Sequence, residues 1–285
     1  MTSYTAVPFR HGLLSISAAA VAWGVGGAVA ALLLRTSGLG PVAVSFWRFA
    51  VAALCLALLP SRDRHGTGRG AAVLTGLGLA VSQCAYFGSV QYAGLGLGTL
   101  ITIGAGPVLT SLGGHVLLGE RLGGRAVVAV GLALGGLVLL VAAPAAGPRP
   151  ALGVALAVLA GAGQSGLTLW ARGGGSARAS AGAFTTGLLC LLPLAAVQGL
   201  LPNAGNPAVT WGAMLFLGTV PTLLAYRWYF TGLSVVPGTT AAVLVLWEPA
   251  TAAVMGVVFL GEPLTAGLLA GSALLLAAIA TLARE

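Results

Sequence analysis

Continuous apolar stretches, separated by short polar segments, follow one another along nearly the whole chain. Six of them have about the length that an α-helix needs to cross the hydrocarbon core of a bilayer, roughly 20 residues. A membrane β-strand would instead alternate apolar and polar positions over ~10 residues. The pattern therefore predicts transmembrane helices. The six stretches are residues 12–34, 41–60, 126–143, 151–171, 238–260 and 264–283.

Two further uncharged stretches are too long for one transmembrane helix each. Residues 70–119 comprise 50 positions and residues 179–226 comprise 48. As one helix, the first would be ~75 Å long, against a hydrocarbon core of ~30 Å. We expect each to form two helices, divided at the glycine-rich segment 94–98 and at the Pro/Asn/Gly segment 202–207. The predicted total is ten helices.

Composition restricts the class of protein further. Of the 285 residues, 58% are hydrophobic and only 6% are charged, and the mean hydropathy is +1.02. Soluble domains carry roughly a quarter charged residues, and disordered chains combine low hydrophobicity with high charge, so both classes are excluded. The sequence predicts an all-α integral membrane protein whose first partner is the lipid bilayer.

All thirteen basic residues are arginine, and they give the chain a net charge of +8. In a soluble protein this charge would suggest a nucleic-acid partner, but here it is read as a topology signal, because cytoplasmic loops are enriched in Arg. With the N-terminus inside, ten arginines lie inside and three outside. We therefore expect cytoplasmic termini and a bacterial-type plasma membrane. The inside set is Arg10, Arg62, Arg64, Arg69, Arg121, Arg125, Arg172, Arg178, Arg227 and Arg284, and the outside set is Arg35, Arg48 and Arg149.

The two halves of the chain share sequence elements. The element from Pro107 to Glu120 recurs as the element from Pro249 to Glu262, 142 positions later, and each begins with Pro and ends with Gly-Glu. A set of glycine and arginine positions near the start of each half recurs 137 positions later. In that set, Gly24, Gly26 and Arg35 match Gly161, Gly163 and Arg172.

These matches divide the chain into two five-helix repeats, residues 12–143 and 151–283, joined by a Pro/Gly/Ala linker at 144–150. Because five is odd, the second repeat must enter the membrane from the opposite side. The sequence thus predicts inverted repeats, the architecture associated with alternating-access transporters.

In these features the chain resembles the EamA family of the drug/metabolite transporter superfamily. The resemblance covers nearly the whole length and rests on the two five-helix halves, the R-x-x-x-A pattern from Arg48 to Ala52, the two Pro…Gly-Glu elements and the pair Glu248-Pro249. It implies a secondary active transporter that exports amino acids or similar small metabolites by alternating access. Import is the alternative. Arg227 departs from the family pattern and marks either a subfamily or an interfacial arginine.

Glu248 is the sharpest candidate for function, because a carboxylate near the membrane midplane costs several kcal/mol unless it is paired or protonated. It is expected to couple protons or bind a substrate amine, or else to be a structural partner. Pro249 removes a backbone donor beside it, and Pro107 is its counterpart in the first half. Three roles are possible for Arg48: its side chain extends to the outer membrane interface, forms a salt bridge in a gate, or binds a substrate carboxylate.

The remaining candidates are two aromatic residues, Trp23 and Trp247, and two intramembrane amides, Gln83 and Gln164. Each fits either helix packing or a cavity wall. Glu120 and Glu262 stand at helix ends, where we expect structural caps. The polar midplane residues predict that the first, third, fourth, sixth, eighth and ninth helices line a central cavity, with the fifth and tenth helices at the periphery.

Two other classes of function are the alternatives to transport. An intramembrane enzyme would need a nucleophile with a base, or metal ligands, and three His with five acidic residues offer little material. A non-transporting scaffold or sensor is the other. The chain contains no phosphate-binding loop or dinucleotide fingerprint, so we expect no enzyme activity, no cofactor and no metal. Glycine pairs of the GxxxG type, such as Gly131 with Gly135, would serve internal packing or a homodimer.

Overall fold

The computed structural model describes residues 8–58, 69–119, 124–142, 147–172, 181–233, 235–236, 244–245 and 247–282. Within these ranges every regular element is a helix, so the predicted all-α class is confirmed. The helices are α1 (Phe9–Thr36), α2 (Pro41–Leu58), α3 (Arg69–Ala93), α4 (Leu95–Leu118), α5 (Gly124–Ala142), α6 (Pro150–Arg172), α7 (Ala181–Gln198), α8 (Pro207–Gly218), η1 (Thr219–Leu224), α9 (Ala225–Leu233), α11 (Trp247–Leu260) and α12 (Ala266–Leu282).

Among the described residues, six helices are long and apolar enough to cross a membrane, one of which runs from Pro207 to Tyr229 through α8, η1 and α9. Four shorter apolar helices lie in α5, α7, α11 and α12. In water such a set of surfaces would be unstable, since side chains such as Val197 and Leu58 are exposed. The architecture is that of a multi-pass membrane protein.

The two turn signals that divide the long apolar stretches act as the sequence predicts. Gly94 separates α3 from α4 at φ +99°, a value that side chains rarely allow. Between α7 and α8, the Asn206 side chain caps α8 by accepting a hydrogen bond from the Ala208 amide at 2.9 Å, with Pro207 in the first turn.

One predicted helix differs from the structure, and the start of another lies outside the described residues. The eighth is not one regular α-helix, because residues 219–224 form a π-helical turn between α8 and α9. The ninth was expected over 238–260 with Glu248 ten residues inside it. Residues 237–243 and 246 lie outside the described part of the chain, Leu244 and Val245 are helical, and α11 is described from Trp247 to Leu260. The start of this helix and the depth of Glu248 within it therefore stay a prediction.

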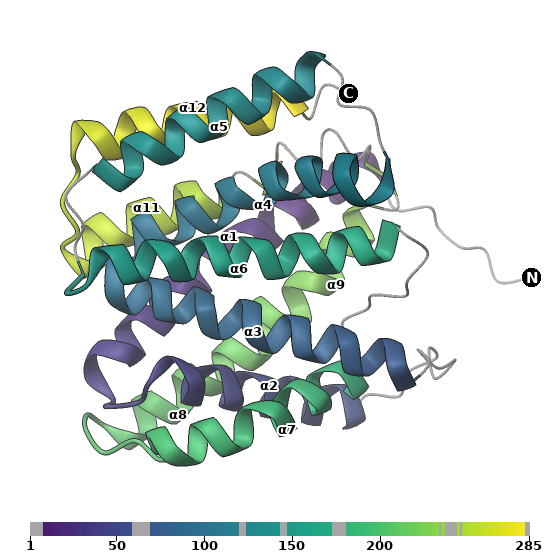
Figure 1. Ribbon diagram of the computed structural model, residues 1–285. Coiled ribbons are helices and arrows are strands. Elements are labelled where there is room, and N and C mark those ends of the chain that lie inside the picture. The colour runs from purple at the N-terminus through teal and green to yellow at the C-terminus, as the bar shows by residue number, and fades with distance from the viewer. Residues whose placement is uncertain are drawn as a thin grey trace, which may run out of the picture.

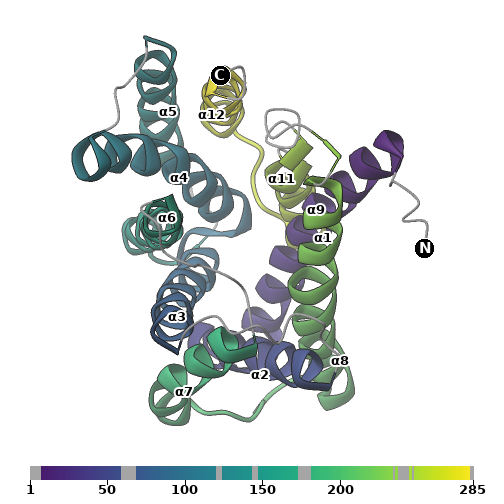
Figure 2. The same ribbon diagram turned by 90° about the vertical axis from the view of Figure 1, so that its right-hand side faces the viewer.

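The helices run roughly along one direction, and short connections such as Gly94 and residues 261–265 gather at one end of the bundle (Figure 1). We call this the Gly94 end and the opposite one the Phe9 end. Seen along the bundle, α5 and α12 pack together at one edge, and α2 and α7 pack together at the opposite edge (Figure 2). The two edge pairs enclose α1, α3, α4, α6, α8, α9 and α11.

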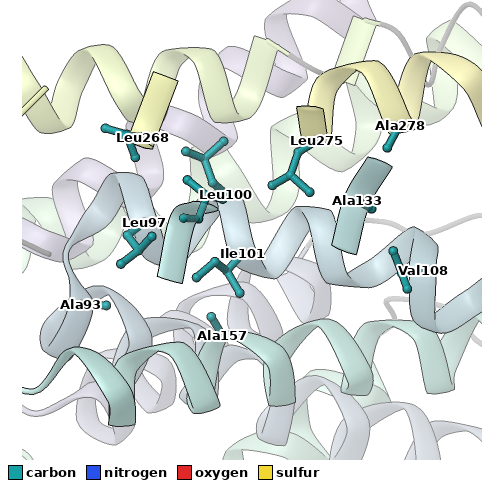
Figure 3. Packing of buried hydrophobic residues seen from close by; sticks show 11 residues of the cluster. Ala93, Leu97, Leu100, Ile101, Val108, Ala133, Ala157, Leu268, Leu275 and Ala278 are labelled. Carbon is teal, nitrogen blue, oxygen red and sulfur yellow. The ribbon is translucent and has the colours of Figure 1, made fainter. Parts of the chain in front are cut away.

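A large apolar cluster joins the α5–α12 edge to the rest of the bundle (Figure 3). Leu100, Ile101 and Val108 of α4 lie between Leu275 of α12 and Ala157 of α6. Glycine allows the close approach here. A Cβ on Gly136 would lie 2.8 Å from the Gly271 carbonyl oxygen.

On α5 the close glycine contact lies at Gly136 and not at the expected pair, Gly131 and Gly135. A Cβ on Gly131 would meet no heavy atom within 4 Å, and one on Gly135 would only touch Leu274 at 3.7 Å. Gly136 makes the close contact instead, because it faces α12. The internal-packing role that we predicted for α5 glycines therefore belongs to Gly136, which meets Gly271 of α12, while a homodimer role for Gly131 and Gly135 stays a prediction.

Candidate functional site

A cavity of about 610 Å³ occupies the middle of the bundle. Its described lining comes from α1, α2, α3, α4, α6, α8, η1, α9 and α11, together with Val245, while the described residues of α5, α7 and α12 contribute nothing to it. The wall is mostly apolar, with a few polar and charged groups. These are Arg48, Ser82, Gln83, Thr102, Thr110, Gln164, Ser165, Thr168 and Glu248, with the aromatic residues Trp23, Tyr86, Phe87, Tyr226 and Tyr229.

Arg48 is held in place on the α2 side of the cavity. Its Nε donates to the Thr222 hydroxyl at 2.7 Å, and one Nη donates to the Gln83 side-chain oxygen at 2.5 Å. The guanidinium also lies 5.6 Å from the centre of the Phe87 ring. These contacts point Arg48 into the bundle rather than out to the membrane interface, which decides against snorkelling.

The π-helical turn supplies one acceptor for this arginine and another for Trp23. Thr222 donates its hydroxyl hydrogen to the Leu217 carbonyl at 2.8 Å, which leaves an oxygen lone pair for Arg48. Pro221 has no backbone N–H, and its carbonyl accepts from the Trp23 indole at 2.8 Å. π-helical turns frequently occur at functional sites, since they free backbone groups for other partners.

Trp23 connects α1 to α9 as well as to η1. Its ring centre lies 5.4 Å from that of Tyr226 and 5.5 Å from that of Tyr229. All three rings line the cavity, so the midplane tryptophan that the sequence singled out belongs to an aromatic wall. Ring packing and the Trp23–Pro221 hydrogen bond hold Trp23 in this wall.

Glu248 lines the cavity from α11. A Cβ on Gly24 of α1 would lie 2.7 Å from the Glu248 carbonyl oxygen, so α1 and α11 touch at this position. Arg48 and Glu248 face the same cavity, yet within the described residues they form no ion pair at 4.0 Å or less.

The structure places the other candidates in different surroundings. Gln83 and Gln164 line the cavity, whereas Trp247 is 54% exposed and is not part of the described lining. Pro249 is buried in α11, and Pro107 lies in α4 one residue after Gly106 of the wall. The described residues contain no cluster of three His, Cys, Asp or Glu side chains that would hold a metal ion.

Comparison with known proteins identifies the family. The model of the EamA-like transporter family matches residues 10–142 and again residues 151–284. The chain belongs to the EamA-like transporter family. It is 30% identical over 274 residues to the "Uncharacterized transporter YwfM" of Bacillus subtilis, covering 92% of this chain and 90% of that protein.

A second relative of this EamA-like protein is the "Uncharacterized protein PA1977" of Pseudomonas aeruginosa, with 35% identity over 290 residues, 95% of this chain and 96% of that one. A crystal structure with 20% identity matches 95% of this chain and 98% of its own, with a TM-score of 0.63, which shows a shared fold. The family and these matches make the protein a multi-pass membrane transporter.

Sequence reasoning missed several residues of the EamA-like cavity. Tyr86 shares a hydrogen bond of 3.0 Å with Thr99, and Tyr226 and Thr222 belong to the wall or to its support. Helical spacing could have found some of them, because Tyr86 follows Gln83 by three positions on one face of α3. Pro221 signals a break in regular α-helix within this apolar stretch, but it does not specify the π-helical turn that aims Thr222.

Glu262 belongs to a separate polar cluster at the Gly94 end. Its side chain is nearly fully buried and accepts hydrogen bonds from the backbone amides of Leu95 and Gly96, the latter at 2.7 Å. It thereby caps the N-terminus of α4. Arg35 of α1 lies 4.0 Å from this carboxylate and donates to the Leu260 carbonyl at 2.7 Å. Glu120, its counterpart in the repeat, lies outside the described residues.

Proposed function

We propose that this protein is a secondary active transporter that exports amino acids or similar small metabolites by alternating access, with the central cavity as its substrate site. The observation that carries the proposal is the cavity itself. Charged and amide side chains, Arg48, Gln83 and Glu248, face a space of about 610 Å³ inside helices that are otherwise apolar. Charged groups in membrane spans face substrate pathways far more often than lipid.

Helix packing supports two inverted five-helix repeats. In the two repeats, α1 corresponds to α6, α3 to α9, and α4 to α11. The pair α3–α6 is therefore equivalent to α1–α9, and the pair α4–α6 is equivalent to α1–α11. All four pairs are in contact. The same exchange relates α2–α7 and α5–α12 to themselves, and these are the two edge pairs. An approximate two-fold axis through both edges and the cavity accounts for this pattern.

Single glycine contacts follow the same relation. Gly24 meets α11 at the Glu248 carbonyl, and its counterpart Gly161 meets α4, where a Cβ would lie 2.9 Å from the Thr102 carbonyl and 3.3 Å from the Gly106 nitrogen. Gly106 and Glu248 themselves are 142 positions apart, the offset of the Pro…Gly-Glu elements. The second repeat thus carries a carboxylate where the first carries no side chain.

The described helices pack closely at the Gly94 end of the bundle. Toward the Gly94 end, buried residues such as Val90, Leu95 and Ala252 pack α1, α3, α4 and α11 together. Toward the Phe9 end, the cavity wall continues through Thr110 and Thr168. With cytoplasmic termini in a bacterial-type plasma membrane, as the arginine distribution predicts, the Gly94 end faces outward, and an inward-facing state would receive substrate from the cytoplasm at the Phe9 end.

A flux experiment tests the proposal. The purified protein is reconstituted into liposomes loaded with single radiolabelled amino acids or dipeptides, and release is measured with and without a pH gradient. At least one solute should leave faster than from protein-free liposomes. Failure of every solute to leave faster would contradict transport, and uptake without release would reverse the proposed direction.

A matched pair of glycine variants links the flux to the cavity. Gly106 and Gly131 both lie inside helices, and a Cβ on either meets nothing within 4 Å. Gly106 lines the cavity, while Gly131 is exposed on α5 at the edge of the bundle. We expect Gly106→Trp to block release because the indole fills the cavity, and Gly131→Trp to retain it. Equal rates in the two variants would place the substrate elsewhere.

A further inference from the structure

We propose that the cavity recognises its substrate as a zwitterion, with a carboxylate bound by Arg48 and a protonated amine bound by Glu248. This inference rests on the proposed function of the cavity as the substrate site. It narrows the small metabolites considered there to molecules that carry both charges, and it assigns each charge to one side chain.

Arg48 is prepared to bind a carboxylate. A guanidinium carries five N–H donors, of which the contacts to Thr222 and Gln83 use two. The remaining donors include both on the second Nη, and Arg48 is a cavity wall residue. Because its two partners and the Phe87 ring fix its orientation, little side-chain entropy is lost on binding. Neither partner is charged, so the positive charge is not neutralised by them.

Glu248 is correspondingly prepared to bind a protonated amine. It reaches the cavity from α11, across the bundle from the α2 helix that carries Arg48 (Figure 2). The described residues offer its carboxylate no ion pair, since the one ion pair among them joins Arg35 to Glu262. A cavity with one unpaired cation and one unpaired anion, both inside a membrane protein, is expensive until a ligand satisfies both.

Charge selects the ligand class. When Glu248 is ionised, the charges of the two cavity side chains sum to zero, so a ligand with one positive and one negative group balances each of them. A plain anion would meet Arg48 but leave Glu248 beside added negative charge, and a plain amine would do the reverse. Trp23, Tyr86 and Tyr226 supply an apolar wall for an uncharged side chain of the ligand.

The position of Arg48 would also allow it to bind substrate in both states of an alternating-access cycle, open at one end of the bundle or at the other. Its partners Gln83 on α3 and Thr222 on η1 are 139 positions apart. They are equivalent in the repeats, because Gly163 packs against Ser82 beside the first and Gly26 packs against Pro221 beside the second. Arg48 therefore lies near the two-fold axis and can hold the carboxylate whichever end of the bundle is open.

Ligand analogues that lack one charge test the inference. Binding of radiolabelled L-phenylalanine to purified protein is measured in competition with unlabelled L-phenylalanine, 2-phenylethylamine, which lacks the carboxylate, and 3-phenylpropionate, which lacks the amine. The three share one aromatic body, so only the charges differ. We expect each analogue to compete roughly tenfold to a hundredfold more weakly than the amino acid, the loss typical of one charge-assisted hydrogen-bonding group.

Two variants assign the charges, with Arg149→Gln, on an exposed side chain outside the cavity, as the control. Binding is followed with L-phenylalanine and both analogues. In Arg48→Gln the amine should gain relative to the amino acid, because the carboxylate no longer finds a partner. In Glu248→Gln the acid should gain instead. A merely structural role would weaken all three ligands alike in each variant.

The outcomes separate this inference from the proposed function. Equal competition by all three ligands in the wild-type protein would overturn the inference, and so would the same ranking in both variants. If liposomes release a solute that carries a single charge while L-phenylalanine neither binds nor leaves, transport stands and the zwitterion site fails. If the analogues rank as expected but no solute is released, the site stands and transport fails.

Discussion

Removal of the Glu262 carboxylate is the sharpest test of how the helices are held together. The side chain is 7% exposed and accepts from two amides at the start of α4, one of them on Leu95, which is fully buried. Hydrogen bonds to a charged group contribute about 1.5–3 kcal/mol each, and a buried amide left without a partner costs about 1–3 kcal/mol. We expect Glu262→Ala to lower the free energy of unfolding by roughly 3–5 kcal/mol.

Two further variants divide this loss between capping and ion pairing. Glu262→Gln keeps one acceptor oxygen and should cost about 1–3 kcal/mol. Arg35→Ala removes the cation 4.0 Å away, but that side chain is 45% exposed, so its ion pair should contribute less than about 1 kcal/mol. The measurement is reversible unfolding of the purified protein in mixed micelles, monitored by circular dichroism.

Gly256 offers an independent check of the same geometry. A Cβ at this position would lie 2.6 Å from a Glu262 carboxylate oxygen, so Gly256→Ala must displace the cap. In the Glu262→Ala background the same change should cost far less, because the obstructing side chain is gone. The capping explanation would be refuted if Arg35→Ala destabilised as much as Glu262→Ala, or if the Gly256 effect were the same in both backgrounds.

Three further predictions concern packing, the cavity and topology. Gly271→Leu should cost about 1–3 kcal/mol by forcing α12 from α5, whereas Gly131→Leu, which faces open space, should unfold like the wild type. Trp23→Phe loses its bond of 2.8 Å to the π-helical turn and should lower stability by about 1 kcal/mol, seen in the same unfolding assay. With the native cysteines replaced, Ala204→Cys should react with an impermeant thiol reagent added outside intact cells and His11→Cys should not; the reverse pattern would invert the topology.

The sequence alone determined the class of protein, because membrane insertion depends on length and hydrophobicity that can be counted. Long uncharged stretches leave no alternative to apolar helices, and Gly94 marked a real break since few residues adopt its φ of +99°. The family followed from the order of short elements around Arg48 and Glu248. None of this required knowledge of which helices touch.

The tertiary structure decided how the chosen residues meet. Arg48 could have snorkelled outward, and its contacts with Gln83 and Thr222 depend on segments 35 and 174 positions away. The π-helical turn that aims Thr222 contains Pro221, which signals a break in regular α-helix, but the sequence does not show which distant groups the turn contacts. The shift from Gly131 to Gly136 has a similar cause.

The different roles of Glu248 and Glu262 also depend on the tertiary structure and not on the sequence alone. Both are acidic residues of the second repeat beside α11, and sequence spacing gives each a place along the chain. Only packing gives Glu262 two buried amides to cap and leaves Glu248 facing the cavity. A carboxylate is structural or available to a ligand according to the donors around it, and those donors come from α4, far away in sequence.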